Sequence, residues 1–203
     1  LSLFPPIIWP HINKDKINNE LLCLWITPLR SLSQQIKISI DEFITENNLN
    51  LTVAIRNGDT PPKIRNQQRK KLPNILITTP ESLQLLISSK NWSKNFSSLS
   101  AIVVDEWHEL LGSKRGVQTE LCIGAIRNLN KNVLIWGISA TIGNLEEAKN
   151  VLLGNFNTLN QDVLIQSKIK KQILLTKMKL KLPTQKKLKK LKVRYRGKKM
   201  QIK

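Results

Sequence analysis

The sequence predicts an α/β domain in which a parallel β-sheet is covered by helices on both faces. Short apolar runs bounded by turn residues recur along residues 1–160, and helical patterns lie between them. The runs are apolar throughout instead of alternating with polar residues. Strands of that kind are typical of parallel sheets whose two faces are both buried. We expect one such domain over residues 1–160.

Strand and helix candidates alternate along this domain. The strand candidates are residues 21–26, 51–55, 75–78, 101–105 and 133–136, with a weak one at 163–166. The helix candidates are residues 29–44, where apolar side chains recur at helical spacing, and 61–71, 81–89, 115–129 and 145–153. Ligands of such sheets bind beyond the carboxyl ends of the strands, so the residues directly after each strand hold the functional information.

Charge divides the chain near residue 160. The 203 residues hold 33 Lys and Arg against 14 Asp and Glu, a net charge of +19. Residues 161–203 contain 16 basic residues and one acidic residue, which leaves only +4 on residues 1–160. This basic, low-complexity tail has too little apolar surface to fold alone. Three interpretations stay open: nonspecific binding of nucleic acid or other polyanions, a solvated disordered segment, or an aberrant continuation after a frameshift or premature stop.

Composition excludes several classes of protein. No apolar run approaches the roughly 18 residues of a membrane span, so we expect no membrane partner. The chain begins with Leu instead of Met, and no secretory signal pattern is visible. Cys23 and Cys122 lie 99 residues apart in apolar segments, without a CxxC or Cys/His cluster. A reducing, cytoplasmic location is therefore expected.

Two strand-to-helix junctions share a Thr-Pro pair, Thr27-Pro28 and Thr79-Pro80. A threonine hydroxyl can cap a helix, and proline suits the first helical position. Each junction is therefore expected to present a helix N-terminus that suits a phosphate group, and Arg30 adds a cation. Capping without any ligand is the alternative interpretation.

The fourth strand ends in Asp105-Glu106-Trp107-His108. Adjacent carboxylates at the tip of an apolar strand suit nucleotide hydrolysis, in which the Asp holds hydrated Mg²⁺ and the Glu deprotonates the attacking water. A solvated acidic turn is the alternative. His108 is either an ordinary histidine or a relay to a neighbouring segment, and the absence of a suitably spaced second His or Cys argues against metal ligation.

The fifth strand continues into Ser139-Ala140-Thr141. Two hydroxyls directly after a buried strand can hydrogen-bond to a group at the tip of the adjacent strand. Asn144 and Glu147 have the spacing of a capping pair, which predicts the start of a helix. A plain strand-loop-helix junction is the alternative.

Together and in this order, these segments resemble the first motor domain of superfamily 2 helicases, which has a RecA-like fold. Residues 27–30, 78–82, 105–108 and 139–141 look like that family's motifs Ia, Ib, II and III. The residue sequences of these motifs are most similar to those of the long helicase-related branch, and within it to those of the bacterial ligase-associated DEXH-box DNA helicases. The segments that carry this likeness are 25–32, 56–60, 75–83, 104–116 with 118–120, and 136–147, and the resemblance covers about residues 1–165.

The resemblance implies an ATP-dependent DNA helicase of the DNA-repair type, with ATP and Mg²⁺ as cofactors. DNA would be its partner, RNA is a weaker alternative, and ligase and nuclease partners and a nucleoid-associated location would follow. Asp105 and Glu106 would bind the nucleotide, Asp105 through water-bound Mg²⁺ and Glu106 as catalytic base. The residues that would couple ATP to movement are His108, Ser139 and Thr141. The residues that would lie along the nucleic-acid strand are Thr27, Arg30, Gly58, Thr60, Thr79 and Pro80, with Arg56 and Arg115 as weaker candidates.

Two features of the family are missing from the sequence. ATP use requires a GxxxxGK[ST] loop, but the only Gly-Lys pair, Gly197-Lys198, is followed by Lys199. Nothing after residue 160 resembles the second motor domain, which contributes an arginine to the transferred phosphate. We therefore expect an incomplete first motor domain that begins just after its phosphate-binding loop and is inactive alone. The alternative class is a noncatalytic basic nucleic-acid-binding protein with a degenerate helicase fold.

Overall fold

A computed structural model of the chain describes residues 20–140, 142–154 and 163–165. Strands and helices alternate within these residues, as the sequence predicts. The strands are β1 (Cys23–Ile26), β2 (Val53–Arg56), β3 (Ile75–Thr78), β4 (Ala101–Val104) and β5 (Leu134–Gly137). The helices are α2 (Arg30–Glu46), α3 (Pro62–Lys70), α4 (Pro80–Ile87), α5 (Trp92–Phe96), α6 (Trp107–Leu110), α7 (Lys114–Leu129) and α8 (Leu145–Leu153).

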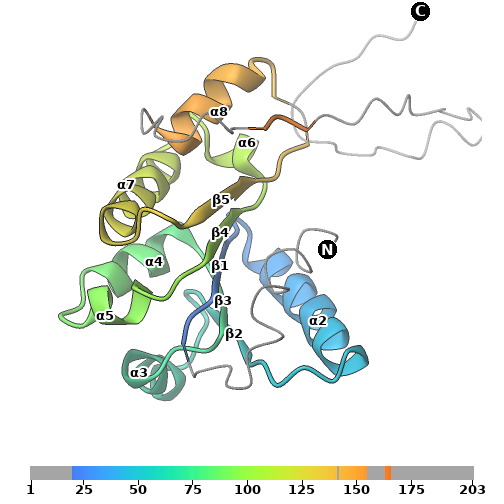
Figure 1. Cartoon of the computed structure of the whole chain (residues 1–203), viewed down its shortest axis with the longest axis vertical. Helices are drawn as coiled ribbons and strands as arrows, with labels where there is room; N and C mark the ends of the chain where they lie inside the picture. Colours follow the sequence, from blue (N-terminus) through green and yellow to red (C-terminus); the bar gives the residue numbers. More distant parts are fainter. Residues whose placement is uncertain (1–19, 141, 155–162, 166–203) are drawn as a thin grey trace, which may run out of the picture. The chain divides into compact units, whose positions relative to one another are not determined.

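The five strands form one parallel sheet in the order β2-β3-β1-β4-β5 (Figure 1). The register aligns their last residues. Ile26 at the centre is level with Thr78 and Val104, and the row continues to Arg56 on one side and Gly137 on the other. All five chain segments that follow the strands therefore leave from one edge of the sheet.

Each face of the sheet has its own hydrophobic core. On one face, alternate strand residues such as Trp25, Ile77 and Val103 pack with Ile40 and other apolar residues of α2. On the opposite face, residues such as Leu24 and Ile102 pack with α4, α5, α6, α7 and α8. Figure 1 shows α2 on one side of the sheet and α4, α5 and α7 on the other. The predicted parallel sheet with helices on both faces is confirmed.

The local starts and ends of elements were predicted with mixed success. The capping pair at α8 is confirmed, because Asn144 Oδ1 accepts a hydrogen bond from the Glu147 amide at 3.2 Å. The short helices α5 and α6 were not predicted, because four or five residues are too few to show a helical period. Within the described ranges, no helix is long and apolar enough to cross a membrane.

The weak strand expected at residues 163–166 is wrong for the part that the structure describes. Residues 163–165 form no strand, and the side chains of Val163 and Ile165 are 78% and 83% exposed. An apolar run without a neighbouring strand to pair with stays irregular. Residue 166 and most of the expected basic tail lie outside the described residues, so the domain boundary at residue 160 stays a prediction.

Candidate functional site

The aligned strand ends collect the predicted site residues into two neighbouring groups. The nucleic-acid candidates follow β1, β2 and β3, which are adjacent in the sheet. Asp105 and His108 follow β4, and Ser139 follows its neighbour β5. One sheet edge therefore presents both halves of the expected site, as the sequence predicts.

His108 connects the ends of β4 and β5. Its Nδ1 atom lies 3.0 Å from Ser139 Oγ and 3.3 Å from Glu106 Oε2. Its Nε2 atom lies 3.5 Å from Glu109 Oε1. The hydroxyl-to-strand-tip contact expected for Ser139 is thus present, whereas Thr141 lies outside the described residues.

The carboxylate of Asp105 is held by N–H donors on both oxygens. The Glu106 amide donates to Oδ1 at 2.9 Å, and the Trp25 indole donates to Oδ2 at 3.4 Å. Trp25 is buried on β1, the strand next to β4. Sequence reasoning missed this role, although a buried tryptophan in an aliphatic strand signals an indole N–H that needs a partner.

Glu106 has a left-handed backbone, with φ 47° and ψ 46°. This conformation is unfavourable by roughly 1–2 kcal/mol for a residue with a side chain, so the surroundings must hold it. Trp107 does so, because its amide donates to Ile138 O at 2.9 Å and its indole to Ala148 O at 3.0 Å. The side chain of Glu106 remains 35% exposed. Trp107 is a second residue whose role the sequence did not reveal.

The donor set of this edge fits a magnesium ion that arrives with a nucleotide. Mg²⁺ in such sites takes one or two carboxylates together with phosphate oxygens and water. Asp105 suits this role, because its two hydrogen bonds fix its orientation and leave lone pairs on both oxygens. The part of the chain that the structure describes contains no group of three or more His, Cys, Asp and Glu that could hold a metal.

Arg30 and Gly58 form the exposed part of the nucleic-acid group. Arg30 Nη1 lies 2.8 Å from Asp59 Oδ1, and both side chains are exposed. The guanidinium also covers Gly58, where an added Cβ would lie 2.5 Å from Arg30 Nη2. The loop after β2 and the start of α2 are therefore in direct contact.

The predicted threonines are buried and support the loops from inside. Thr60 Oγ1 accepts a hydrogen bond from the Asn57 amide at 2.9 Å. Thr79 Oγ1 lies 3.3 Å from Ser82 Oγ. The hydroxyl of Thr27 donates to Leu29 O, two residues further along the chain, at 3.5 Å. In this conformation, the threonines fix the backbone of the strand-end loops, and Arg30 and Gly58 are at the surface.

The first Thr-Pro junction differs from the prediction. α2 begins at Arg30, and its N-cap is Leu29, an extended residue whose side chain makes no capping hydrogen bond. Thr27 and Pro28 thus precede the helix and belong to the connection between β1 and α2. At the second junction Thr79 is the N-cap residue and Pro80 is the first helical residue, as expected, but the Thr79 side chain makes no capping hydrogen bond.

Arg115, a weaker nucleic-acid candidate, is engaged within the protein. Its Nε donates to Glu81 Oε1 at 2.5 Å and its Nη2 to Pro28 O at 2.9 Å. It therefore ties α7 to both Thr-Pro junctions. Burial by itself would raise the pKa of Glu81, but the hydrogen bond from Arg115 and smaller contributions that include Thr79 lower that pKa below its ordinary value.

Arg56, the other weaker candidate, is buried at the end of β2. Its Nη1 donates to Arg65 O at 3.1 Å and to Gln68 Oε1 at 3.3 Å, so the side chain faces α3. Burial lowers its pKa, and the charges of Arg69 and Arg65 lower it further.

Comparison with known proteins agrees with this architecture. Residues 5–148 match the family described as DEAD/DEAH box helicase. The ATP-dependent helicase Lhr-Core of Saccharolobus solfataricus is 35% identical over 150 residues, which are 70% of this chain and 17% of that protein. The structure of Mycobacterium smegmatis helicase Lhr bound to ssDNA and AMP-PNP has a TM-score of 0.62 and 26% identity. It covers 73% of this chain, which spans 21% of that one.

A more distant structure supports the fold alone. The DEAD-box helicase Mss116, bound to ssRNA and UDP-BeF, has a TM-score of 0.65 and 23% identity. The matched region is 74% of this chain and 32% of the Mss116 chain. The sheet order, the two buried faces and the family match lead to the same result. The chain belongs to the DEAD/DEAH box helicase family and has the RecA-like helicase fold.

Proposed function

We propose that the chain is part of the first motor domain of an ATP-dependent DNA helicase related to Lhr. The observation that carries the proposal is the row of strand ends at one edge of the sheet, with the His108–Ser139 contact after β4 and β5 and with Arg30 and Gly58 after β1 and β2. The chain spans only about a fifth of its relatives' length, so whole-protein activity is part of the proposal.

The end of β4 would serve the nucleotide. ATP and Mg²⁺ would supply the phosphoryl group and the charge that stabilises its transfer. Asp105, oriented by its two N–H donors, would hold the hydrated ion. The exposed part of Glu106 would orient a water and accept its proton. His108 lies within reach of both Glu106 and Ser139, so it would pass a change at the nucleotide to β5, with Thr141 as a further member.

The ends of β1, β2 and β3 would hold a nucleic-acid strand by its backbone. Arg30 supplies an exposed cation, and Gly58 has no side chain to keep that guanidinium away from the loop where a phosphate would bind. Thr27, Thr60 and Thr79 would act by fixing the loops, and Pro80 by starting α4 at the same edge. No base would be read by these contacts, as expected of a motor that moves along any sequence.

DNA is the favoured nucleic acid. The M. smegmatis relative, at 26% identity, is described as bound to ssDNA, whereas the RNA-bound structure is below 25% identity and supports only the fold. Competition of fluorescent single-stranded DNA by unlabelled DNA or RNA of the same sequence tests this, and stronger competition by RNA would reverse the assignment. A repair role, ligase and nuclease partners and a nucleoid-associated cytoplasmic location stay predictions from the family resemblance.

We infer that the 203-residue polypeptide made by itself hydrolyses ATP very slowly, because its sequence contains no GxxxxGK[ST] loop to cradle the phosphates. Phosphate release from the purified polypeptide, with and without DNA, measures this directly. Stimulated release at a rate of the order of one per second would contradict the inference.

The catalytic assignment is tested in a chimera that supplies the phosphate-binding loop and second motor domain of the S. solfataricus relative. Glu106→Gln should abolish DNA-stimulated turnover and leave ATP binding intact. Glu46→Gln, an exposed change at the end of α2, is the matched control and should keep full activity. Retained turnover in Glu106→Gln would remove this residue from the role of base. A fully folded chimera that binds DNA but never hydrolyses ATP would favour the noncatalytic alternative.

A further inference from the structure

The basic charge of the described motor unit is concentrated on one helix and the residue after it. Residues 62–71 contain five basic side chains and no acidic one. The rest of residues 20–154 contains ten basic and twelve acidic side chains, so the unit is slightly acidic outside this segment. The five basic residues are Lys63, Arg65, Arg69, Lys70 and Lys71.

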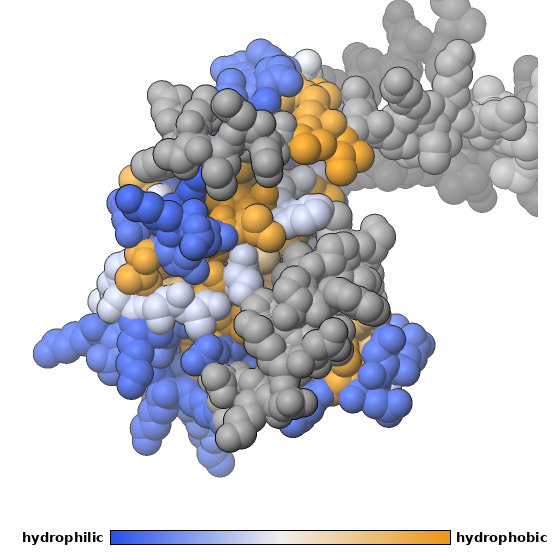
Figure 2. All heavy atoms as spheres, in the orientation of Figure 1, coloured by the Kyte–Doolittle hydropathy of each residue, from blue (hydrophilic) through white to orange (hydrophobic). Residues whose placement is uncertain are grey.

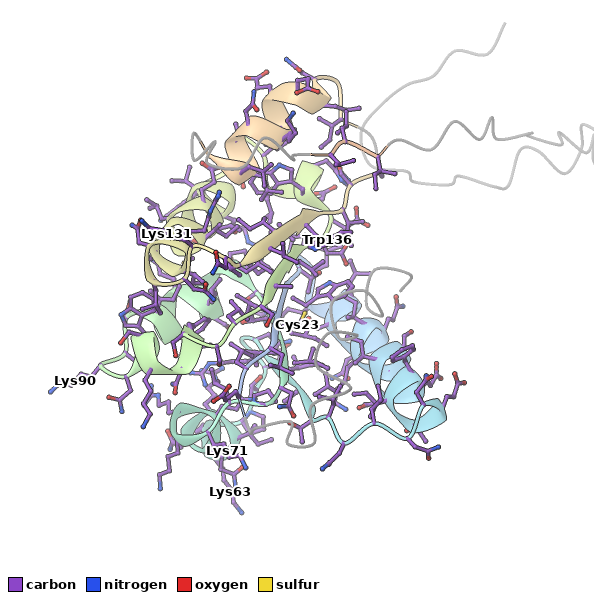
Figure 3. The ribbon with its side chains drawn as sticks, in the orientation of Figure 1. Cys23, Lys63, Lys71, Lys90, Lys131 and Trp136 are labelled. Carbon is purple, nitrogen blue, oxygen red and sulfur yellow. The ribbon has the colours of Figure 1, made fainter. Side chains whose placement is uncertain are left out.

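Four of these cations face solvent. Lys63, Arg69, Lys70 and Lys71 are exposed, and none forms an ion pair with a residue that the structure describes. In Figure 3, Lys63 and Lys71 point away from the protein. Figure 2 shows a broad hydrophilic surface in the same part of the view, where Figure 1 places α3. Helix α3 therefore presents a strongly cationic surface.

Polar contacts connect this helix to the proposed nucleic-acid loop. The guanidinium of Arg65 donates to Gly58 O at 2.5 Å and to Asn57 O at 3.2 Å. Gln68, the one buried residue of α3, donates to Ile55 O at 3.0 Å. The helix thus begins beside the loop that Arg30 covers and extends toward the start of β3. Neither hydrophobic core of the described residues includes a residue of α3, so polar contacts attach this helix to the domain.

Helix stability accounts for only part of this pattern. Arg69 and Lys70 lie in the last turn, where the helix dipole favours cations. Lys63 lies in the first turn, where the dipole disfavours a cation. The charges also act on one another: burial lowers the pKa of the Arg56 guanidinium most, and the charges of Arg69 and Arg65 lower it further. A bound polyanion would relieve this repulsion and would give Lys63 a partner.

We propose that α3 and Lys71 bind the sugar-phosphate backbone of nucleic acid that continues beyond the loop at Gly58. The proposal rests on the proposed function, which places a strand at that loop. Helix α3 has no aromatic residue, so its contacts would go to phosphates and not to bases. The α3 surface would extend the nucleic-acid contact from the strand-end loops past β2, the strand at that end of the sheet order.

The test compares two triple variants of the full 203-residue chain that lose the same charge. Lys63→Gln, Lys70→Gln and Lys71→Gln neutralise the α3 surface. Lys90→Gln, Lys94→Gln and Lys131→Gln neutralise exposed lysines elsewhere, and Figure 3 shows Lys90 and Lys131 well away from Lys63. Binding of fluorescent single-stranded DNA is measured at several salt concentrations, after unfolding curves confirm that both variants remain folded.

The α3 variant should bind at least about tenfold more weakly, and its salt slope should fall by about 2, because each phosphate contact contributes roughly 0.7 on a single strand. The control variant should change by less than about threefold. Equal weakening in both variants would overturn the proposal, since it would assign the effect to bulk charge. So would unchanged binding in the α3 variant.

Three further readouts make the result specific. Arg30→Gln separates the two proposals: unchanged binding would count against the strand-end site, and a loss confined to Arg30→Gln would count against α3.

In the unmodified chain, DNA should protect Lys63 and Lys71 from acetylation more than Lys90 and Lys131, and equal protection would overturn the proposal. If the α3 variant loses polyglutamate binding as strongly as DNA binding, the surface takes acidic polymers in general and the nucleic-acid assignment fails.

Discussion

His108 Nδ1 lies 3.0 Å from Ser139 Oγ, and this contact joins the segments that follow two neighbouring strands of the sheet. The same nitrogen lies 3.3 Å from Glu106 Oε2. Glu106 and Ser139, from the segments after β4 and β5, thus both lie close to one atom of His108. A displacement of Glu106 would therefore act on Ser139 through a single imidazole.

A double-mutant cycle should detect this contact in the folding stability of the chain. His108→Ala and Ser139→Ala are expected to show a coupling of about 1 kcal/mol, the usual contribution of a partly buried hydrogen bond. Urea unfolding of the two single variants and the double variant measures it. Ser97→Ala, at a distant exposed site, should be additive with Ser139→Ala. Additivity of the His108 and Ser139 changes would contradict the contact.

Removal of the Asp59 charge should strengthen nucleic-acid binding. Asp59 pairs with Arg30 at 2.8 Å, so Asp59→Asn would free the guanidinium for a phosphate and remove a repulsive charge. Binding should tighten by about fivefold, which corresponds to about 1 kcal/mol. Fluorescence anisotropy with single-stranded DNA measures the change. Asp41→Asn, which breaks the Lys37–Asp41 pair on α2, serves as the control. Equal effects of the two variants would show that Asp59 does not compete for Arg30.

Two glycines of α7 should respond to alanine in opposite directions. A Cβ at position 116 would lie 2.1 Å from Leu110 O, so Gly116→Ala should destabilise the protein by about 1–3 kcal/mol. Gly124 has no atom within 4 Å of such a Cβ, so Gly124→Ala should stabilise the helix by about 0.5–1 kcal/mol. Thermal unfolding compares the two. Shifts of the same sign would contradict the close packing of α6 on α7, which positions His108.

The Glu81–Arg115 contact should lose its stabilising effect in acid. The folded-state pKa of Glu81 is lowered below its ordinary value of 4.5, chiefly by Arg115 acting against burial. The stabilisation is therefore fully present above about pH 4.5 and is lost as the pH falls through the lowered pKa. The difference in melting temperature between the unmodified chain and Glu81→Gln should shrink between pH 6 and pH 3. A difference that stays constant or grows toward low pH would contradict this contact.

The alternation of strands and helices could be predicted because it depends on local patterns of apolar residues. The position of the strand-end residues could be predicted from the parallel topology. Parallel neighbouring strands end at the same edge of the sheet, which brings Asp105, His108 and Ser139 together. The start of α2 could not be predicted in the same way. The helix begins two residues after Pro28, with Leu29 as an N-cap that makes no side-chain hydrogen bond, and the Thr-Pro pair alone does not indicate this.

Contacts between residues far apart in the chain could not be predicted from the sequence. The hydrogen bond from Trp25 to Asp105 depends on which strands are neighbours, and the sheet order is needed to see it. The burial of Arg56 likewise depends on where α3 packs. The charge of Lys63 and its neighbours is visible in the sequence, but its concentration on one exposed helix face is a result of folding.

Hydrogen exchange with and without single-stranded DNA shows whether the strand-end loops hold nucleic acid, because it measures every one of these loops in the full chain at once. DNA binding should slow exchange in residues 27–30, 57–60 and 79–82, which follow β1, β2 and β3. Residues 97–100 and 130–133, which precede β4 and β5 at the opposite edge, should be unchanged. Protection confined to the opposite edge, or absent from all three strand-end loops, would contradict the account.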